Sequence, residues 1–138
     1  MKIVLVIMCA AAVSLGTAVY ALFHGYFDHG QFEIKQAQWS SSKQVAVVAE
    51  RSDQEALSGY TYFVLIGNHL FSPAELRHAY HSNAVVFAAA TNCLGLRWES
   101  PSKLVVACAG SEVDANHIDV QKQQSGGITV TYKNIPLK

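Results

Sequence analysis

The chain has 138 residues, enough for one domain of ordinary size, and its ten basic and ten acidic side chains give a formal net charge of zero. Hydrophobic residues make up 51% of the chain and charged residues only 14%, against about 25% in average globular proteins. Because it contains no basic stripe and no run of charge, the sequence excludes the electrostatic surface that nucleic-acid binding requires.

The N-terminal segment, residues 1–23, holds most of the apolar excess and has no charged residue after Lys2. The stretch from Ile3 to Phe23 approaches the ~20 apolar residues that a helix needs to cross a bilayer. By the positive-inside rule, Lys2 keeps the N-terminus in the cytoplasm. We therefore expect a single-pass anchor in the cytoplasmic membrane, which places the remainder in the periplasm. The alternative is a signal peptide, with secretion after cleavage near Ala21.

Residues 24–31 are predicted to be a linker, and a β-rich extracytoplasmic domain is predicted over residues 32–138. Apolar and polar residues alternate from Phe32 onward, which is typical of a half-buried strand. The valine-rich segment 44–50 predicts a second strand. The serines between the two segments favour a turn, so together they indicate a hairpin.

The polar stretch from Glu50 to Gly59 is expected to be an exposed loop, and the aromatic and β-branched residues 60–66 predict the clearest strand in the chain. Further apolar or alternating segments follow after a short helix. About eight short strands and one short helix predict a mainly β domain: an antiparallel sandwich, open barrel or meander. The later strand segments are 84–90, 93–98, 103–109, 116–123 and 128–135.

The stretch "SPAELRHAY" predicts the one short helix of this domain. Ser72 can cap it, Pro73 suits the first helical position, and Glu75 completes a capping box. Leu76 and Ala79 lie on one apolar side. The helix is too short to be stable alone, so we expect it to pack on the sheet.

One phrase occurs twice, as "QWSSSKQVAVVAE" and again as "RWESPSKLVVACAG". When Trp39 is aligned with Trp98, Lys43 and Lys103 fall at the ends of two short polar turns. We interpret the phrase as a repeated hairpin in which each Trp closes a hairpin end and covers the core beneath the turn. The alternative is a coincidence between two hairpins of similar composition.

The first copy resembles the W-S-P-D-G-K hairpin in blades of TolB-type and WD-like β-propellers, since Trp39, Ser40, Lys43 and Ala46 fit and the Asp-Gly positions do not. A blade takes about 40–45 residues, so this chain cannot close a propeller ring. The chain also resembles small membrane-anchored bacterial proteins, a group with no established activity, that carry one such hairpin and end in an I-x-V-x-Y strand. The resemblance implies a membrane location and a β-rich architecture, and no reaction.

Cys93 and Cys108 lie in the two arms of the second hairpin, and the strand register decides whether they meet. If Trp98 pairs with Lys103, Cys93 lies opposite Cys108 within reach of a disulfide, which an exported domain permits. If Trp98 pairs with Leu104, the core face is better and Cys93 points away, leaving two buried thiols. Both registers stay open.

Glu75, His78 and His81 are the candidate metal ligands, spaced three residues apart along the short helix. Residues three apart share a side of a helix, and a zinc site needs three or four converging ligands. Alternatively, Glu75 serves only as the capping acid, and the two histidines stand near a helix C-terminus, where positive charge is favoured. We assign no cofactor.

We therefore expect a non-enzymatic extracytoplasmic binding or accessory module, tethered to the membrane by its N-terminal helix. Its partner would be another envelope protein, and the loop 50–59 and the helix from Ser72 to His81 are its expected contact surfaces. The alternative function is a metal-dependent enzyme or metal-binding protein that uses Glu75, His78 and His81. The sequence has no G-x-S-x-G motif, and we assign no catalytic residue.

Overall fold

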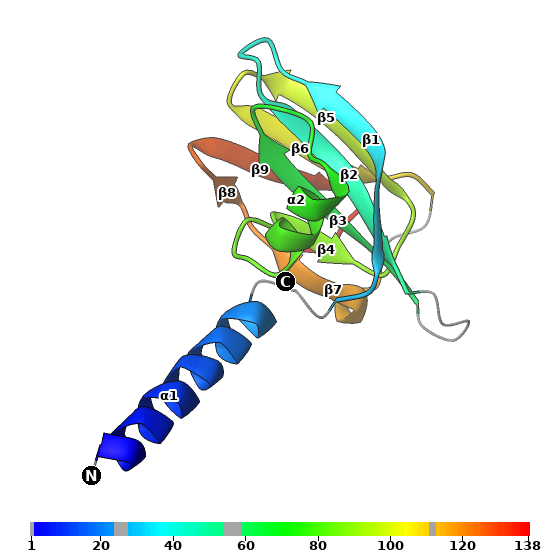
Figure 1. Cartoon of the computed structure of the whole chain (residues 1–138). Coiled ribbons are helices and arrows are strands. Elements are labelled where there is room, and N and C mark those ends of the chain that lie inside the picture. Colours follow the sequence, from blue (N-terminus) through cyan, green and yellow to red (C-terminus); the bar gives the residue numbers. More distant parts are fainter. Residues whose placement is uncertain (1, 24–27, 54–58, 111–112) are drawn as a thin grey trace.

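The computed structural model describes residues 2–23, 28–53, 59–110 and 113–138, with the side chains of residues 2–5 and 23 left out (Figure 1). Most of the described chain beyond residue 28 is strand, so the expected mainly β fold is confirmed. In chain order the elements are α1 (Lys2–Phe23), β1 (Gln31–Trp39), β2 (Val45–Ser52), β3 (Tyr60–Gly67), α2 (Pro73–Tyr80), β4 (Phe87–Ala89), β5 (Leu94–Ser100), β6 (Lys103–Cys108), a 3₁₀ turn (Ala115–His117), β7 (Ile118–Gln121), β8 (Gln124–Ser125) and β9 (Ile128–Lys133).

The strands form two sheets. The first has the order β1-β2-β3-β4-β7 and is antiparallel throughout, and the second has the order β5-β6-β9-β8. In the second sheet β6 and β9 are parallel, which differs from the antiparallel arrangement expected. Parallel neighbours need a crossover, and here the chain leaves the second sheet, adds β7 to the first, and then returns.

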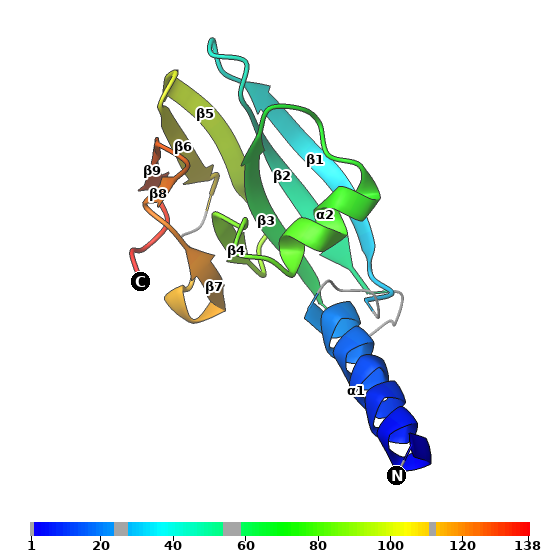
Figure 2. The ribbon, with the colours of Figure 1, turned by 60° about the vertical axis from the view of Figure 1, so that its left-hand side comes forward.

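The first sheet is the middle layer, with the second sheet on one face and α2 on the other (Figure 2). Its strand β2 is buried on both faces: Ala46 and Val48 pack toward the second sheet, and Val45, Val47 and Ala49 pack toward α2. Burial on both faces explains why this strand reads as a continuous apolar run instead of an alternating one.

The two Trp hairpins have similar pairing, since Trp39 pairs with Val45 and Trp98 pairs with Leu104, but only the second has a register shift next to its Trp. They also touch: the indole nitrogen of Trp98 donates to the carbonyl oxygen of Gln38 at 2.9 Å. Trp98 packs against the core between the sheets, whereas Trp39 is 51% exposed. The prediction that each Trp covers the core is therefore wrong for Trp39.

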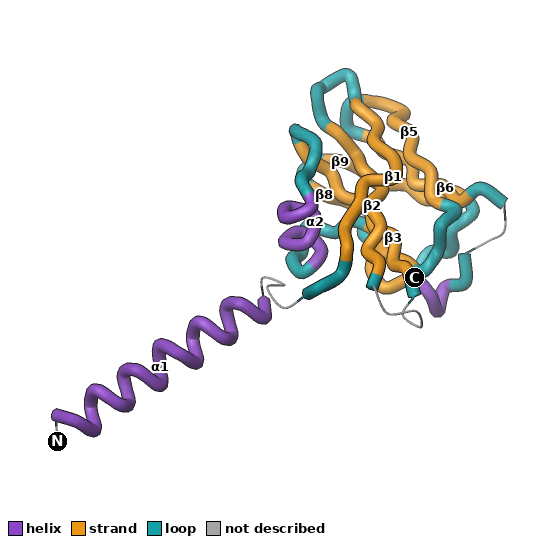
Figure 3. The backbone as a smooth tube through the Cα atoms, turned by 45° about the vertical axis from the view of Figure 1, so that its right-hand side comes forward, coloured by secondary structure: helices purple, strands orange, loops and turns teal. Residues whose placement is uncertain are grey.

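Helix α1 extends away from the β-rich body (Figure 3), and every side chain from Val6 to Tyr20 is exposed. Its centre, Ala10 to Ala18, consists mostly of small or hydroxyl-bearing residues, which offer little apolar surface. In the parts of the chain that the structure describes, no helix is both long and apolar enough to span a bilayer. The predicted transmembrane anchor is therefore wrong, and so is the membrane and periplasmic location that we derived from it.

Two predicted boundaries also change. Of the predicted linker 24–31, residues 24–27 lie outside the described residues, and Gln31 already belongs to β1. The predicted loop from Glu50 to Gly59 starts too early, because β2 continues to Ser52, and its residues 54–58 lie outside the described residues.

Candidate functional site

Helix α2 is held on the first sheet by its buried side chains Leu76 and Ala79. The predicted capping box is confirmed: the Glu75 backbone N–H donates to the Ser72 hydroxyl, and the Ser72 backbone N–H donates to the Glu75 carboxylate at 2.7 Å. These reciprocal bonds satisfy donors that a helix N-terminus otherwise leaves open. The cap therefore fixes where this eight-residue helix begins.

A serine, a histidine and a carboxylate lie together at the N-terminus of α2. The Ser72 hydroxyl donates to Glu75 Oε2 at 2.8 Å, and His69 Nε2 lies 2.9 Å from Glu75 Oε1. The Ser72 backbone N–H, followed by His69 and the Ser72 hydroxyl, lowers the pKa of Glu75 to about 2. Because the carboxylate stands between the other two groups, the imidazole does not activate the hydroxyl, and the arrangement is no catalytic triad.

A second charged group lies at the other end of α2, around the buried carboxylate of Asp28. Arg51 donates to both carboxylate oxygens, at 2.7 and 2.9 Å, and His81 Nε2 lies 2.7 Å from Oδ2. The Gly30 backbone N–H completes the shell at 2.8 Å. The Arg51 guanidinium, more than any other neighbour, holds the pKa of Asp28 well below its usual range.

Arg51 extends this network to the rest of the α2 side. Its Nη1 donates to Asp53 at 2.9 Å, and its guanidinium lies 5.6 Å from the centre of the Tyr80 ring. Asp28 therefore ties the segment before β1 to the end of β2 and to the last turn of α2. This group was not predicted from the sequence, although the D-x-G spacing of Asp28 and Gly30 is a turn signal.

The three candidate metal ligands do not converge. Glu75 bonds with His69 and Ser72 at one end of α2, whereas His81 bonds with Asp28 at the other. His78 lies on the exposed side between them. Across the described ranges, no three His, Cys, Asp or Glu side chains form a group that could hold a metal ion.

Two hollows flank α2. The first lies between α2 and β1 and is lined by residues that include Gln31, Phe32 and Arg77, whose guanidinium lies 5.6 Å from the centre of the Phe32 ring. The second lies beyond the C-terminus of α2, against β7, with a volume of about 230 Å³. Its lining residues are Tyr80, Ser82, Asn83, Val85, Ala88, Asp119 and Val120. Helix α2 is thus a ridge between two depressions on one face of the molecule.

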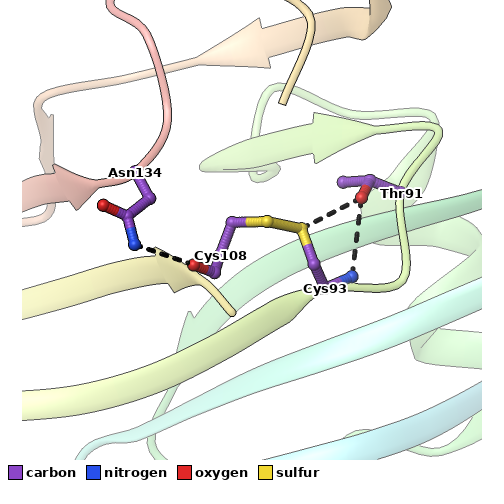
Figure 4. Close-up of a disulfide and its surroundings, with 4 residues drawn as sticks. All are labelled: Thr91, Cys93, Cys108 and Asn134. Carbon is purple, nitrogen blue, oxygen red and sulfur yellow. Dashed lines mark hydrogen bonds between the residues drawn. A yellow bond between two sulfur atoms is a disulfide. The ribbon is translucent and has the colours of Figure 1, made fainter. Parts of the chain in front are cut away.

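Cys93 and Cys108 are joined in a disulfide (Figure 4). Both pack with the core between the two sheets, on the face of the first sheet opposite α2. The register is the one that pairs Trp98 with Leu104, and Cys108 pairs with Leu94. Cys93 precedes β5, so it escapes the alternation of the strand and reaches Cys108 nevertheless, with the two Cα atoms 4.8 Å apart. The disulfide and the register with the better core face, which the sequence presented as alternatives, therefore coexist.

Comparisons with known proteins add no relative: no family model matches the chain, and no curated protein or solved structure was found to be similar to it. The resemblance to propeller-blade hairpins and to small anchored bacterial proteins thus stays a prediction. The geometry of the α2 side is therefore the basis on which a function can be inferred.

Proposed function

We propose that the β-rich body is a protein-binding module that contacts its partner through the α2 side of the first sheet. The observation that carries this proposal is the shape of that side, where α2 forms a ridge between two open hollows. Such relief suits a folded partner or a polypeptide segment. Within the charged group at each end of α2, the side chains bond mainly with one another. This pairing supports a contact surface more than a reaction centre.

Apolar side chains on the same side supply anchors for a partner. Trp39 pairs with Val45, which packs toward α2, and directly paired residues point to the same face of a sheet. Trp39 is 51% exposed, and Leu70, in the segment that leads into α2, is 53% exposed. Tryptophan is enriched among the residues that contribute most to protein–protein binding, so Trp39 is the expected anchor.

Both edge strands of the first sheet are protected, which favours binding at the α2 side over addition of a partner's strand to an edge. β1 carries a bulge between Ile34 and Gln36, and Lys35 at the bulge is paired with Glu33 at 2.7 Å. At the opposite edge, the Lys138 side chain donates to the Ile118 carbonyl in β7. Bulges, lysines and covering segments protect sheet edges against pairing with another chain. A partner would therefore contact the face of the sheet.

The disulfide bears on the kind of compartment in which this function would take place. A structural disulfide persists in oxidising compartments and is rare in reducing ones. The Cys93–Cys108 bond therefore supports an oxidising compartment as the place where the module and its partner meet. Proteins of the same compartment are the partners that we propose.

Site-specific photo-crosslinking tests the proposal. A photoreactive phenylalanine analogue is placed at Ala74, exposed on α2, and in a matched variant at Lys133, exposed on β9 of the second sheet. Irradiation in an extract of the producing cells should give a discrete protein adduct from position 74 and none from position 133. The adduct from position 74 should also disappear in a Trp39→Ser background. Equal adducts from both positions, or none from position 74, would contradict the proposal.

A further inference from the structure

The hollow beside β7 carries a more specific inference, which rests on the proposed protein-binding function. We propose that this hollow binds the side chain of a lysine from the partner, with its ammonium group at Asp119 and its methylene stem on the apolar floor. The floor consists of the buried side chains of Val85 and Ala88, with Val120 half-buried beside them. Ser82, Asn83 and Asp119 are exposed and form the rim.

Asp119 differs from the other acidic residues that the structure describes. Each of those accepts a hydrogen bond or forms an ion pair; they are Asp28, Glu33, Glu50, Asp53, Glu75, Glu99 and Asp114. In the described ranges, no side chain or backbone group pairs with the Asp119 carboxylate. A carboxylate that is free beside an apolar hollow offers a charge to an incoming cation without the need to break an existing pair.

The end of α2 adds to the preference for a cation. Tyr80 is the last residue of α2 and lines the hollow, as does Ser82 just beyond it. The C-terminal carbonyls of a helix carry partial negative charge, and an aromatic ring attracts a cation over its face. The ring of Tyr80 already has Arg51 near it, so the helix end and Asp119 supply most of the attraction.

Positively charged side chains near the hollow should weaken the binding of a lysine there. Lys122 donates through its ammonium to the Asn83 carbonyl at the rim, Arg51 lies near the Tyr80 ring, and His81 bonds with Asp28. Of these, Lys122 stands closest to the rim and should oppose a second cation. The hollow is small, and this size suits the compact ammonium group of lysine better than the wider planar group of arginine.

The test uses the full chain and follows backbone amide chemical shifts by NMR. The probe is Nα-acetyl-lysine-N-methylamide, and the control is the norleucine analogue, which has a similar stem and no ammonium. We expect saturable shifts at Asn83, Asp119 and Val120 with the lysine probe only. Asp119→Asn should weaken binding about fivefold, the effect of losing one exposed ion pair, and Lys122→Gln should strengthen it by about twofold.

Several outcomes would overturn the inference. These are equal binding of the norleucine analogue, unchanged affinity in the folded Asp119→Asn variant, or tighter binding of the corresponding arginine analogue. The experiment also separates the inference from the function on which it rests. If position 74 yields the protein adduct and the lysine probe does not bind, the lysine site is wrong and the protein-binding function stands. If the adduct is missing, the function itself is wrong.

Discussion

The two faces of the first sheet are covered in different ways. On one face a second sheet packs across a core that includes Val48, Val64 and Leu104, and the Cys93–Cys108 disulfide closes that side. On the other face the cover is α2, a single helix of eight residues. One central strand, β2, contributes apolar side chains to both cores.

This difference indicates which face is built for stability and which leaves a surface for recognition. A whole sheet covers a wide area of its neighbour, whereas a short helix covers only a strip and leaves hollows along its sides. The α2 side makes up for the smaller cover by packing the aromatic rings of Phe32, Phe63 and Tyr80 edge to face and by the Asp28 network. Matched variants, one in the core on each face of the first sheet, test whether the two cores behave separately.

The largest effect is expected from Phe63→Ala. Phe63 is fully buried on the α2 side, with its ring centre 5.1 Å from that of Tyr80 and 6.2 Å from that of Phe32. Truncation of a buried phenylalanine leaves a cavity and typically costs about 3–5 kcal/mol. Urea unfolding should show a loss of this size, and hydrogen exchange should show that the α2 amides lose protection.

Phe87→Ala is the matched variant on the opposite face. Phe87 is also fully buried, but it packs in the core between the sheets, 5.5 Å from the ring centre of Tyr132. We expect a similar loss of global stability, with the α2 amides no more affected than those of the strands. If both variants loosen α2 equally, the two faces form one cooperative core and the comparison fails.

The next-largest loss of stability is expected from removal of the disulfide. Replacing Cys93 and Cys108 by serine opens a loop with a sequence separation of 15, for which a loss of about 3 kcal/mol is expected. Both the variant and its parent should carry Cys9→Ser, because Cys9 is an exposed free thiol. A thiol reductant should lower the unfolding midpoint of the parent and leave the serine variant unchanged. A parent insensitive to reductant under unfolding conditions would show that the disulfide contributes nothing.

The sequence predicted local features better than long-range ones. The α2 cap was predictable because Ser72 and Glu75 are three residues apart and the pattern is diagnostic by itself. The pairing around Cys93 was not predictable, because strand alternation does not extend to a residue that lies before the strand. The predicted membrane anchor is wrong because no helix in the described residues is both long and apolar enough to span a bilayer.

The candidate site itself was mostly beyond prediction. Arg51 and His81 reach Asp28 from 23 and 53 residues away in the sequence, and nothing local to Asp28 indicates either partner. The hollow at Asp119 joins the end of α2 to β7, which are brought together by sheet order alone. Helix α2 was predictable from its own residues, but the groups that flank it were not.

Asp28→Asn should lower stability at neutral pH by about 2 kcal/mol, the usual size of a lost hydrogen bond to a charged group. The carboxylate is 4% exposed, and the pKa of Asp28 lies below its unfolded value, so its contribution is fully present above about pH 5. That contribution is lost as the pH falls through the folded pKa. Urea midpoints from pH 7 to pH 3 should therefore fall less in the variant than in the wild type.

Asp119→Asn is the control for this pH dependence, because it removes the same charge from a carboxylate that has no partner in the described residues. Its midpoints should fall with pH as steeply as those of the wild type. If Asp28→Asn retains the full acid dependence, then the Asp28 network does not hold the α2 side together, and other carboxylates explain the effect.

The smallest effect is expected from Ser72→Ala, which removes the side chain that caps α2. Loss of such a cap typically costs about 1 kcal/mol, whereas Ser41→Ala, at an exposed turn position, should change stability by less than about 0.5 kcal/mol. The loss should be confined to the α2 side, since the cap touches no strand of the second sheet. Hydrogen exchange would then show faster exchange in the first turn of α2, with the β6 and β9 amides unchanged. Equal acceleration in those strands would mean that the short helix is no independent cover, and the recognition face could not be altered without weakening the whole body.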